Sequence, residues 1–70
     1  MTVKTMNRHD KPCAVHGLTS YRYQGNYGWI MIGATDHADA LREAQRSMRH
    51  DTPTLDKLQV WNGTQYEGVL

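Results

Sequence analysis

Two stretches of the chain combine apolar runs with turn signals in the way β-hairpins do. Residues 20–24 are rich in tyrosine and residues 27–34 are strongly apolar, with the turn dipeptide Gly25-Asn26 between them. Residues 58–69 repeat this arrangement around Asn62-Gly63, the strongest short hairpin signal because both residues tolerate positive φ. We therefore expect two β-hairpins, one in each half of the chain.

Between the hairpins the apolar positions follow a helical period instead. At 100° per residue, one stripe of the helix collects Ala38, Leu41, Ala44 and Met48, and the opposite side collects Asp39, Arg42, Glu43 and Arg46. Thr35 and Asp36 offer N-caps, so we expect a helix from His37 to about Arg49, and Pro53 forbids its continuation. The order ββαββ predicts an α+β fold, an antiparallel four-stranded sheet with one helix packed on one face.

The alternation of strand side chains divides the sheet residues between two faces. A turn at Gly25-Asn26 places Tyr23 opposite Gly28 and Arg22 opposite Trp29. The helix-facing core is then expected to contain Ile30, Ile32, Leu58 and Val60, packed against Leu41, Ala44 and Met48. The other face is expected to carry Arg22, Trp29, Met31, Trp61 and Tyr66. One helix cannot cover both faces of a sheet.

An exposed apolar patch of this kind is typical of an interaction site. Trp, Tyr, Met and Arg are the residue types enriched at protein interfaces and their hot spots. The sequence leaves three occupants open for this face. Residues 1–17 can fold back over it, a second copy of the chain can bind it to form a homodimer, or a foreign protein can bind it.

The chain has 70 residues, which suits a single domain. Residues 1–17 show no periodic pattern, so we expect a loosely ordered lead-in followed by one domain over residues 18–70. No run of 18 apolar residues is present, so no membrane-spanning helix is expected. The polar start resembles no secretory signal and the lone Cys13 forms no intrachain disulfide, which favours the cytoplasm.

The charge balance argues against a dedicated nucleic-acid binder. The formal net charge is +1 and the pI is about 8.0, whereas such proteins tend to have a pI above about 9 and a concentrated basic stripe. Nucleic-acid binding stays as the alternative function. In that case Trp29, Trp61 and Tyr66 would stack on bases while Arg22 and Arg46 contact phosphates.

The clusters that could carry chemistry are weak. His9, Cys13 and His16 are spaced closely enough for a loop to wrap a metal, but no paired C-x-x-C accompanies them. The same residues could form a thiol–imidazole pair, yet they lie in the least structured part of the chain. His37 falls near the apolar stripe, where a hydrogen-bonded structural role is expected. We therefore expect no enzyme activity, no cofactor and no metal.

A resemblance adds context to this interpretation. It rests on Tyr27-Gly28-Trp29-Ile30-Met31-Ile32-Gly33-Ala34-Thr35, Asp39-Ala40-Leu41, Glu43-Ala44 and Val60-Trp61-Asn62-Gly63 with Tyr66. Over roughly residues 20–69 this pattern resembles small uncharacterised proteins encoded by bacteriophages and prophages. The resemblance implies a mobile-element accessory protein in a bacterial cytoplasm, and it transfers no catalytic residue. By analogy, such a protein would act by occluding a host protein.

Overall fold

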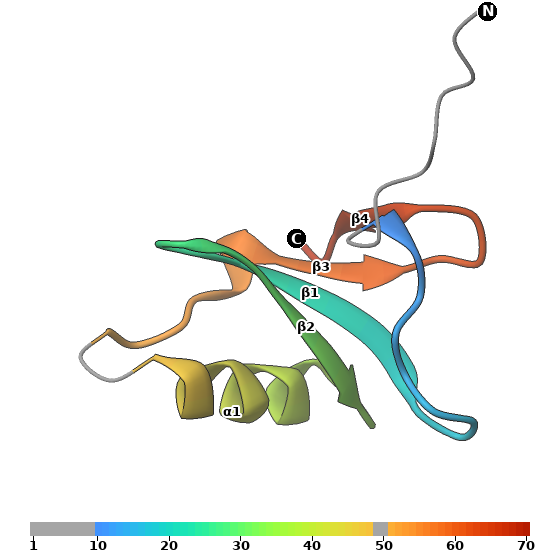
Figure 1. Ribbon diagram of the computed structural model, residues 1–70, viewed down its shortest axis with the longest axis horizontal. Coiled ribbons are helices and arrows are strands. Elements are labelled where there is room, and N and C mark those ends of the chain that lie inside the picture. Colours follow the sequence, from blue (N-terminus) through green and yellow to red (C-terminus); the bar gives the residue numbers. More distant parts are fainter. Residues whose placement is uncertain (1–9, 49–50) are drawn as a thin grey trace, which may run out of the picture.

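The computed structural model describes residues 10–48 and 51–70 (Figure 1). Its elements follow the expected ββαββ order, with one short 3₁₀ helix in addition: β1 (Thr19–Gly25), β2 (Gly28–Ala34), α1 (His37–Ser47), η2 (Leu55–Lys57), β3 (Leu58–Trp61) and β4 (Tyr66–Gly68). The strands form one antiparallel sheet in the order β2-β1-β3-β4, and α1 packs against it. The predicted α+β architecture is confirmed.

The first hairpin turns one residue later than the sequence predicts. Gly25 pairs with Gly28, so residues 26 and 27 form the turn, and Tyr23 lies opposite Ile30 and not opposite Gly28. Gly28 has a φ of +126°, a conformation that glycine adopts without the steric cost of a side chain. The predicted pairing was therefore wrong by two residues. Because side chains alternate with period two, each of them stays on its predicted face.

The second hairpin has a longer loop than the predicted two-residue turn. Trp61 pairs with Tyr66, which leaves four residues between the strands. The Asn62 side chain organises this loop, because its Oδ1 accepts hydrogen bonds from the amides of Thr64 and Gln65, each at 2.9 Å. The strand predicted from Thr64 to Val69 is accordingly shorter and covers Tyr66–Gly68.

The start of α1 is fixed by two carboxylates. The Asp36 side chain caps the helix by accepting a hydrogen bond of 2.8 Å from the Asp39 amide. Asp39 in turn accepts one of 3.1 Å from the backbone amide of Thr35, and this bond is the main reason that the pKa of its carboxyl lies below the ordinary value. The helix begins at His37 as expected and ends at Ser47, two residues before the expected end.

The core lies between α1 and the near face of the sheet. Its buried residues are Tyr21, Tyr23, Ile32, Ala34, Ala40, Ala44 and Leu58, with Ile30, Leu41, Met48, Val60 and Val69 packed around them. Every predicted core residue belongs to this cluster. The predicted helical stripe was wrong at one position, because Ala38 is exposed while Ala40 is fully buried. The small side chains of Ala34, Ala40 and Ala44 let the helix approach β2 closely.

The two core tyrosines place their hydroxyl groups at polar partners. The Tyr21 hydroxyl lies 2.8 Å from Nδ1 of His37, so the expected structural role of this histidine is confirmed. Burial, followed by the nearby charges of Asp36 and Asp39, raises the pKa of Tyr21. The Tyr23 hydroxyl accepts a hydrogen bond of 2.9 Å from the Thr54 amide, which fixes the segment before β3 against the sheet.

Candidate partner-binding surface

The face of the sheet away from α1, hereafter the second face, carries all five residues predicted from the sequence to bind a protein partner. The strand register places the following residues on it: Ser20, Arg22, Gln24, Trp29, Met31, Gly33, Gln59, Trp61, Tyr66 and Gly68. They come from all four strands, and Arg22 pairs directly with Met31 across the β1–β2 ladder. The division of residues between the two faces was thus predicted correctly.

Arg22 lies at the centre of the second face. Its guanidinium carbon is 4.0 Å from the ring centroid of Trp29 and 4.6 Å from that of Tyr66. Its Nε donates a hydrogen bond of 2.6 Å to the side-chain oxygen of Gln59, and a terminal nitrogen forms an ion pair of 2.8 Å with Asp10. Only 14% of the Arg22 side chain is exposed. The guanidinium therefore stacks between two aromatic rings in a fixed orientation.

Tyr66 extends this stack toward the far side of the sheet. Its ring meets Trp61 edge to face, with centroids 5.2 Å apart and planes at 70°. Four side chains consequently contact one another in sequence across the sheet, and we call them the aromatic row: Trp29, Arg22, Tyr66 and Trp61. Four of the five residues proposed from the sequence belong to this row. Met31 lies on the same face, paired with Arg22.

A segment of the lead-in covers part of the second face. This covering segment, residues 10–18, runs from beside β4 to the start of β1 (Figure 1). The amides of Cys13 and Ala14 donate hydrogen bonds of 3.1 and 2.9 Å to the Oγ of Ser20, which is buried. Over Gly33 the segment is so close that a Cβ would stand 3.2 Å from that of Ala14. For residues 10–18, the alternative in which the lead-in folds back is therefore realised; residues 1–9 lie outside the described part.

Tyr66 is buried beneath this segment, with 8% of its surface exposed. Its hydroxyl donates a hydrogen bond of 2.8 Å to the backbone carbonyl of Lys11. Burial, together with the neighbouring Cys13 thiol, raises the pKa of Tyr66 to about 12. Tyr66 thus supports the aromatic row and holds the covering segment.

Three large apolar side chains of the second face remain partly accessible. Trp29, Met31 and Trp61 are each half-buried, and neither tryptophan is enclosed by the covering segment or by α1. We call these three residues the open patch. It lies on a layer of side chains fixed by Arg22 and Tyr66, so its shape is largely set before any partner binds.

The chemical clusters considered in the sequence are not assembled in the part of the chain that the structure describes. The Cys13 thiol lies 3.3 Å from the Ile32 carbonyl oxygen and 3.9 Å from that of Tyr21, and no imidazole contacts it there. Within residues 10–48 and 51–70, no three His, Cys, Asp or Glu side chains gather as metal ligands would. His9 lies outside these ranges.

The two arginines of the nucleic-acid alternative lie on opposite sides of the sheet. Arg22 belongs to the second face, where Asp10 pairs with it. Arg46 is on α1, which packs on the other face, and it forms an ion pair of 3.5 Å with Glu43. The fold therefore does not bring these two cations to one phosphate backbone.

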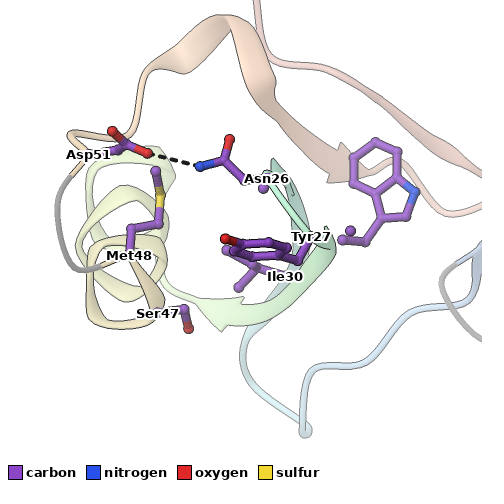
Figure 2. Close-up of a pocket in the computed structure, with 9 residues that line it drawn as sticks. Asn26, Tyr27, Ile30, Ser47, Met48 and Asp51 are labelled. Carbon is purple, nitrogen blue, oxygen red and sulfur yellow. Dashed lines mark hydrogen bonds between the residues drawn. The ribbon is translucent and has the colours of Figure 1, made fainter.

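One pocket escaped the sequence analysis. It has a volume of about 550 Å³ and opens between the β1–β2 turn and the end of α1 (Figure 2). Tyr27 and Ile30 lie on one side and Ser47 and Met48 on the other, while Asn26 donates a hydrogen bond of 3.0 Å to the Asp51 carboxylate at its rim. Its walls come from segments about 20 residues apart in the sequence, so no local sequence pattern predicts it.

Among the described residues, no helix is long and apolar enough to cross a lipid bilayer. Comparison of the chain with models of protein families, with curated proteins and with solved structures gave no match.

Proposed function

We propose that this chain is a non-enzymatic accessory protein that binds another protein through the open patch of the second face. The observation that carries the proposal is the aromatic row, in which Arg22 is stacked between Trp29 and Tyr66 while Tyr66 supports Trp61. A sheet that needed only a solvent-facing surface would gain nothing from two half-exposed indoles there. The residue types of the patch are those that dominate binding energy at protein interfaces.

The rigidity of the surface supports the same function. Arg22 is fixed by two ring contacts, a hydrogen bond to Gln59 and an ion pair with Asp10, so it loses little further freedom when a partner docks over it. Large, rigid aromatic side chains bury much area at a low cost in conformational entropy. The proposed partner is a protein of the bacterial cytoplasm, in keeping with the resemblance to phage-encoded proteins.

Removing both indoles tests the proposal. The Trp29→Ala/Trp61→Ala variant and the wild type are used to capture proteins from a bacterial lysate, and circular dichroism verifies that both are folded. Tyr27→Ala is the matched control, because Tyr27 is fully exposed in the β1–β2 turn, away from the open patch. We expect the wild type and Tyr27→Ala to retain the same protein, and the double variant to lose it.

Two results contradict the proposal. If the folded double variant retains the same partner with unchanged affinity, the open patch is not the binding surface. If the wild type instead retains nucleic acid, with an affinity that falls steeply as the salt concentration rises, the alternative function is correct.

A further inference from the structure

Strand β2 forms one outer edge of the sheet, and its geometry shows which of its backbone groups face outward. In an antiparallel ladder, the amide and carbonyl of alternate residues point toward the partner strand. The Cys13 thiol lies within 3.9 Å of both the Tyr21 and the Ile32 carbonyl oxygens, so these paired residues direct their carbonyls into the space between β1 and β2. The residues of β2 that alternate with Ile32 therefore point outward: Trp29, Met31 and Gly33.

No described residue satisfies these outward groups. β2 pairs with β1 alone, and no backbone hydrogen bond joins it to a loop or to α1 within residues 10–48 and 51–70. Three amides and three carbonyls in a row thus form a template for another extended strand. These groups lie on the edge of the sheet, a different surface from the open patch of the proposed function.

The sequence of β2 lacks the features that usually protect an edge strand. Its seven residues, Gly-Trp-Ile-Met-Ile-Gly-Ala, include no charged residue and no proline, and β2 pairs with β1 without a bulge. The opposite edge is different, because β4 has only three residues and carries Glu67. Natural proteins block long, apolar edges with lysine, proline or bulges to prevent pairing. An unblocked edge of this length favours a partner strand.

The strand is also complementary to itself. Antiparallel pairing of two copies about a two-fold axis at Met31 places Trp29 of one copy opposite Gly33 of the other. The space over Gly33 on this face is already filled by Ala14 and Leu18 of its own chain, so the indole of the second copy packs beside the glycine, against these side chains. No like charges face each other in this arrangement, since β2 carries none.

Helix α1 lies on the core side of the sheet, where it packs chiefly against β2. Its first residue, His37, also reaches the Tyr21 hydroxyl of β1 at 2.8 Å. When two copies join, their helices come to lie on the same side of the extended sheet.

From these observations we propose that β2 is a homodimer interface, through which two copies of the chain form one continuous eight-stranded sheet. The occupant of the edge is a second copy because the strand is uncharged, so that pairing with its own sequence opposes no like charges. This interface uses the backbone edge of β2 and the proposed function uses the open patch, and Trp29 and Met31 belong to both.

Hydrogen exchange of the full chain tests the pairing directly. We expect the amides of Trp29, Met31 and Gly33 to be protected at high protein concentration, and to exchange at least tenfold faster after dilution below the dissociation constant. The inward amides of Ile30 and Ile32 should remain protected throughout. If the outward amides exchange as fast at high concentration as in the dilute sample, the proposal is overturned.

Variants of one residue separate the backbone from the side chain. Met31→Pro removes the outward amide without breaking a ladder bond to β1, which is the position where an edge strand tolerates proline. Met31→Ala keeps that amide and shortens the side chain. Gly68→Pro introduces a proline ring on β4, the opposite edge of the sheet. By sedimentation velocity over a hundredfold range of concentration, we expect Met31→Pro to be monomeric and the wild type and both controls to be dimeric.

Each remaining outcome has a definite meaning. A folded Met31→Pro variant that is still a dimer, or a wild type that is a monomer throughout, overturns the edge interface. If Met31→Pro does not fold, the exchange pattern of the wild type decides. A monomeric wild type that still captures its partner through Trp29 and Trp61 refutes this inference alone and leaves the proposed function standing.

Discussion

Replacing Arg22 with lysine tests the central element of the second face. Lysine keeps the positive charge and a similar aliphatic stem, but it lacks the planar guanidinium that stacks between Trp29 and Tyr66 at 4.0 and 4.6 Å. It also lacks an Nε to donate to Gln59. Its ammonium can still pair with Asp10, whose side chain is 52% exposed. The substitution therefore removes the stacking and one hydrogen bond while preserving the charge.

The size of the effect follows from these contacts. A cation over an aromatic ring contributes about 0.5–2 kcal/mol, depending on how far it is desolvated, and Arg22 has two such rings. A hydrogen bond from a charged donor contributes roughly 1.5–3 kcal/mol. Lysine recovers part of this through contact with one ring and with water. We expect a loss of about 2–3 kcal/mol in the free energy of unfolding, which lowers the Tm of a domain this small by roughly 10–20 °C.

Thermal and urea unfolding followed by circular dichroism measure this loss. Arg46→Lys is the matched control, because Arg46 is 79% exposed and pairs with Glu43 on the surface of α1. We expect that control to stay within about 0.5 kcal/mol of the wild type. If Arg22→Lys also stays within that margin, the guanidinium stack does not stabilise the second face, and the argument for a rigid binding surface fails with it.

Three further substitutions probe the surrounding contacts. Ser20→Ala removes the acceptor for the amides of residues 13 and 14, so we expect a loss of about 1–3 kcal/mol in unfolding experiments and faster hydrogen exchange of both amides. The pKa of Tyr66 is about 12 in the folded state against 10.0 in the free side chain, so the wild type should lose roughly 2 kcal/mol of stability as the pH rises from about 10 to about 12. The folded state holds that proton more tightly than the unfolded chain, and Tyr66→Phe should show a correspondingly smaller loss in urea titrations at pH 9 and 11. Asp36→Ala removes the N-cap of α1 and should cost about 0.5–2 kcal/mol, whereas an unchanged helix signal and stability would contradict the capping role.

The face of the sheet on which each side chain lies could be predicted from the sequence, although the exact pairing of β1 with β2 could not. The predicted turn at Gly25-Asn26 was wrong, yet Tyr21 and Ile32 still face the core and Trp29 the second face. A shift in strand pairing moves side chains to the other face only when it is an odd number of residues, and the observed shift was two residues. The turn itself depends on φ at Gly28, a single backbone angle on which the apolar pattern has no bearing.

The sequence left folding back of the lead-in as one of three alternatives, but the contacts of the covering segment could not be predicted, because its bonds leave no pattern in the sequence. Cys13, Ala14 and Lys11 contribute backbone amides and a carbonyl, which every residue carries, and Ser20 and Tyr66 receive them. The stacking of Arg22 also required the register of β4 to be known, since Tyr66 reaches it from a strand that is not its neighbour. Contacts between strands far apart in the sequence cannot be predicted from local sequence patterns.

Trp29 takes part in both proposed interfaces whereas Trp61 takes part in one, so single substitutions distinguish the two proposals. Trp29 belongs to the open patch and also to β2, where it would lie opposite Gly33 of a second copy. Trp61 lies on β3, separated from the β2 edge by β1, so it can serve the partner but not the edge. We therefore expect Trp29→Ala to weaken both dimerisation and partner capture, and Trp61→Ala to weaken capture alone. Sedimentation velocity and affinity capture on the same two samples check this. If the Trp61→Ala variant is a monomer under conditions where the wild type is a dimer, the dimer forms through the second face and not through β2.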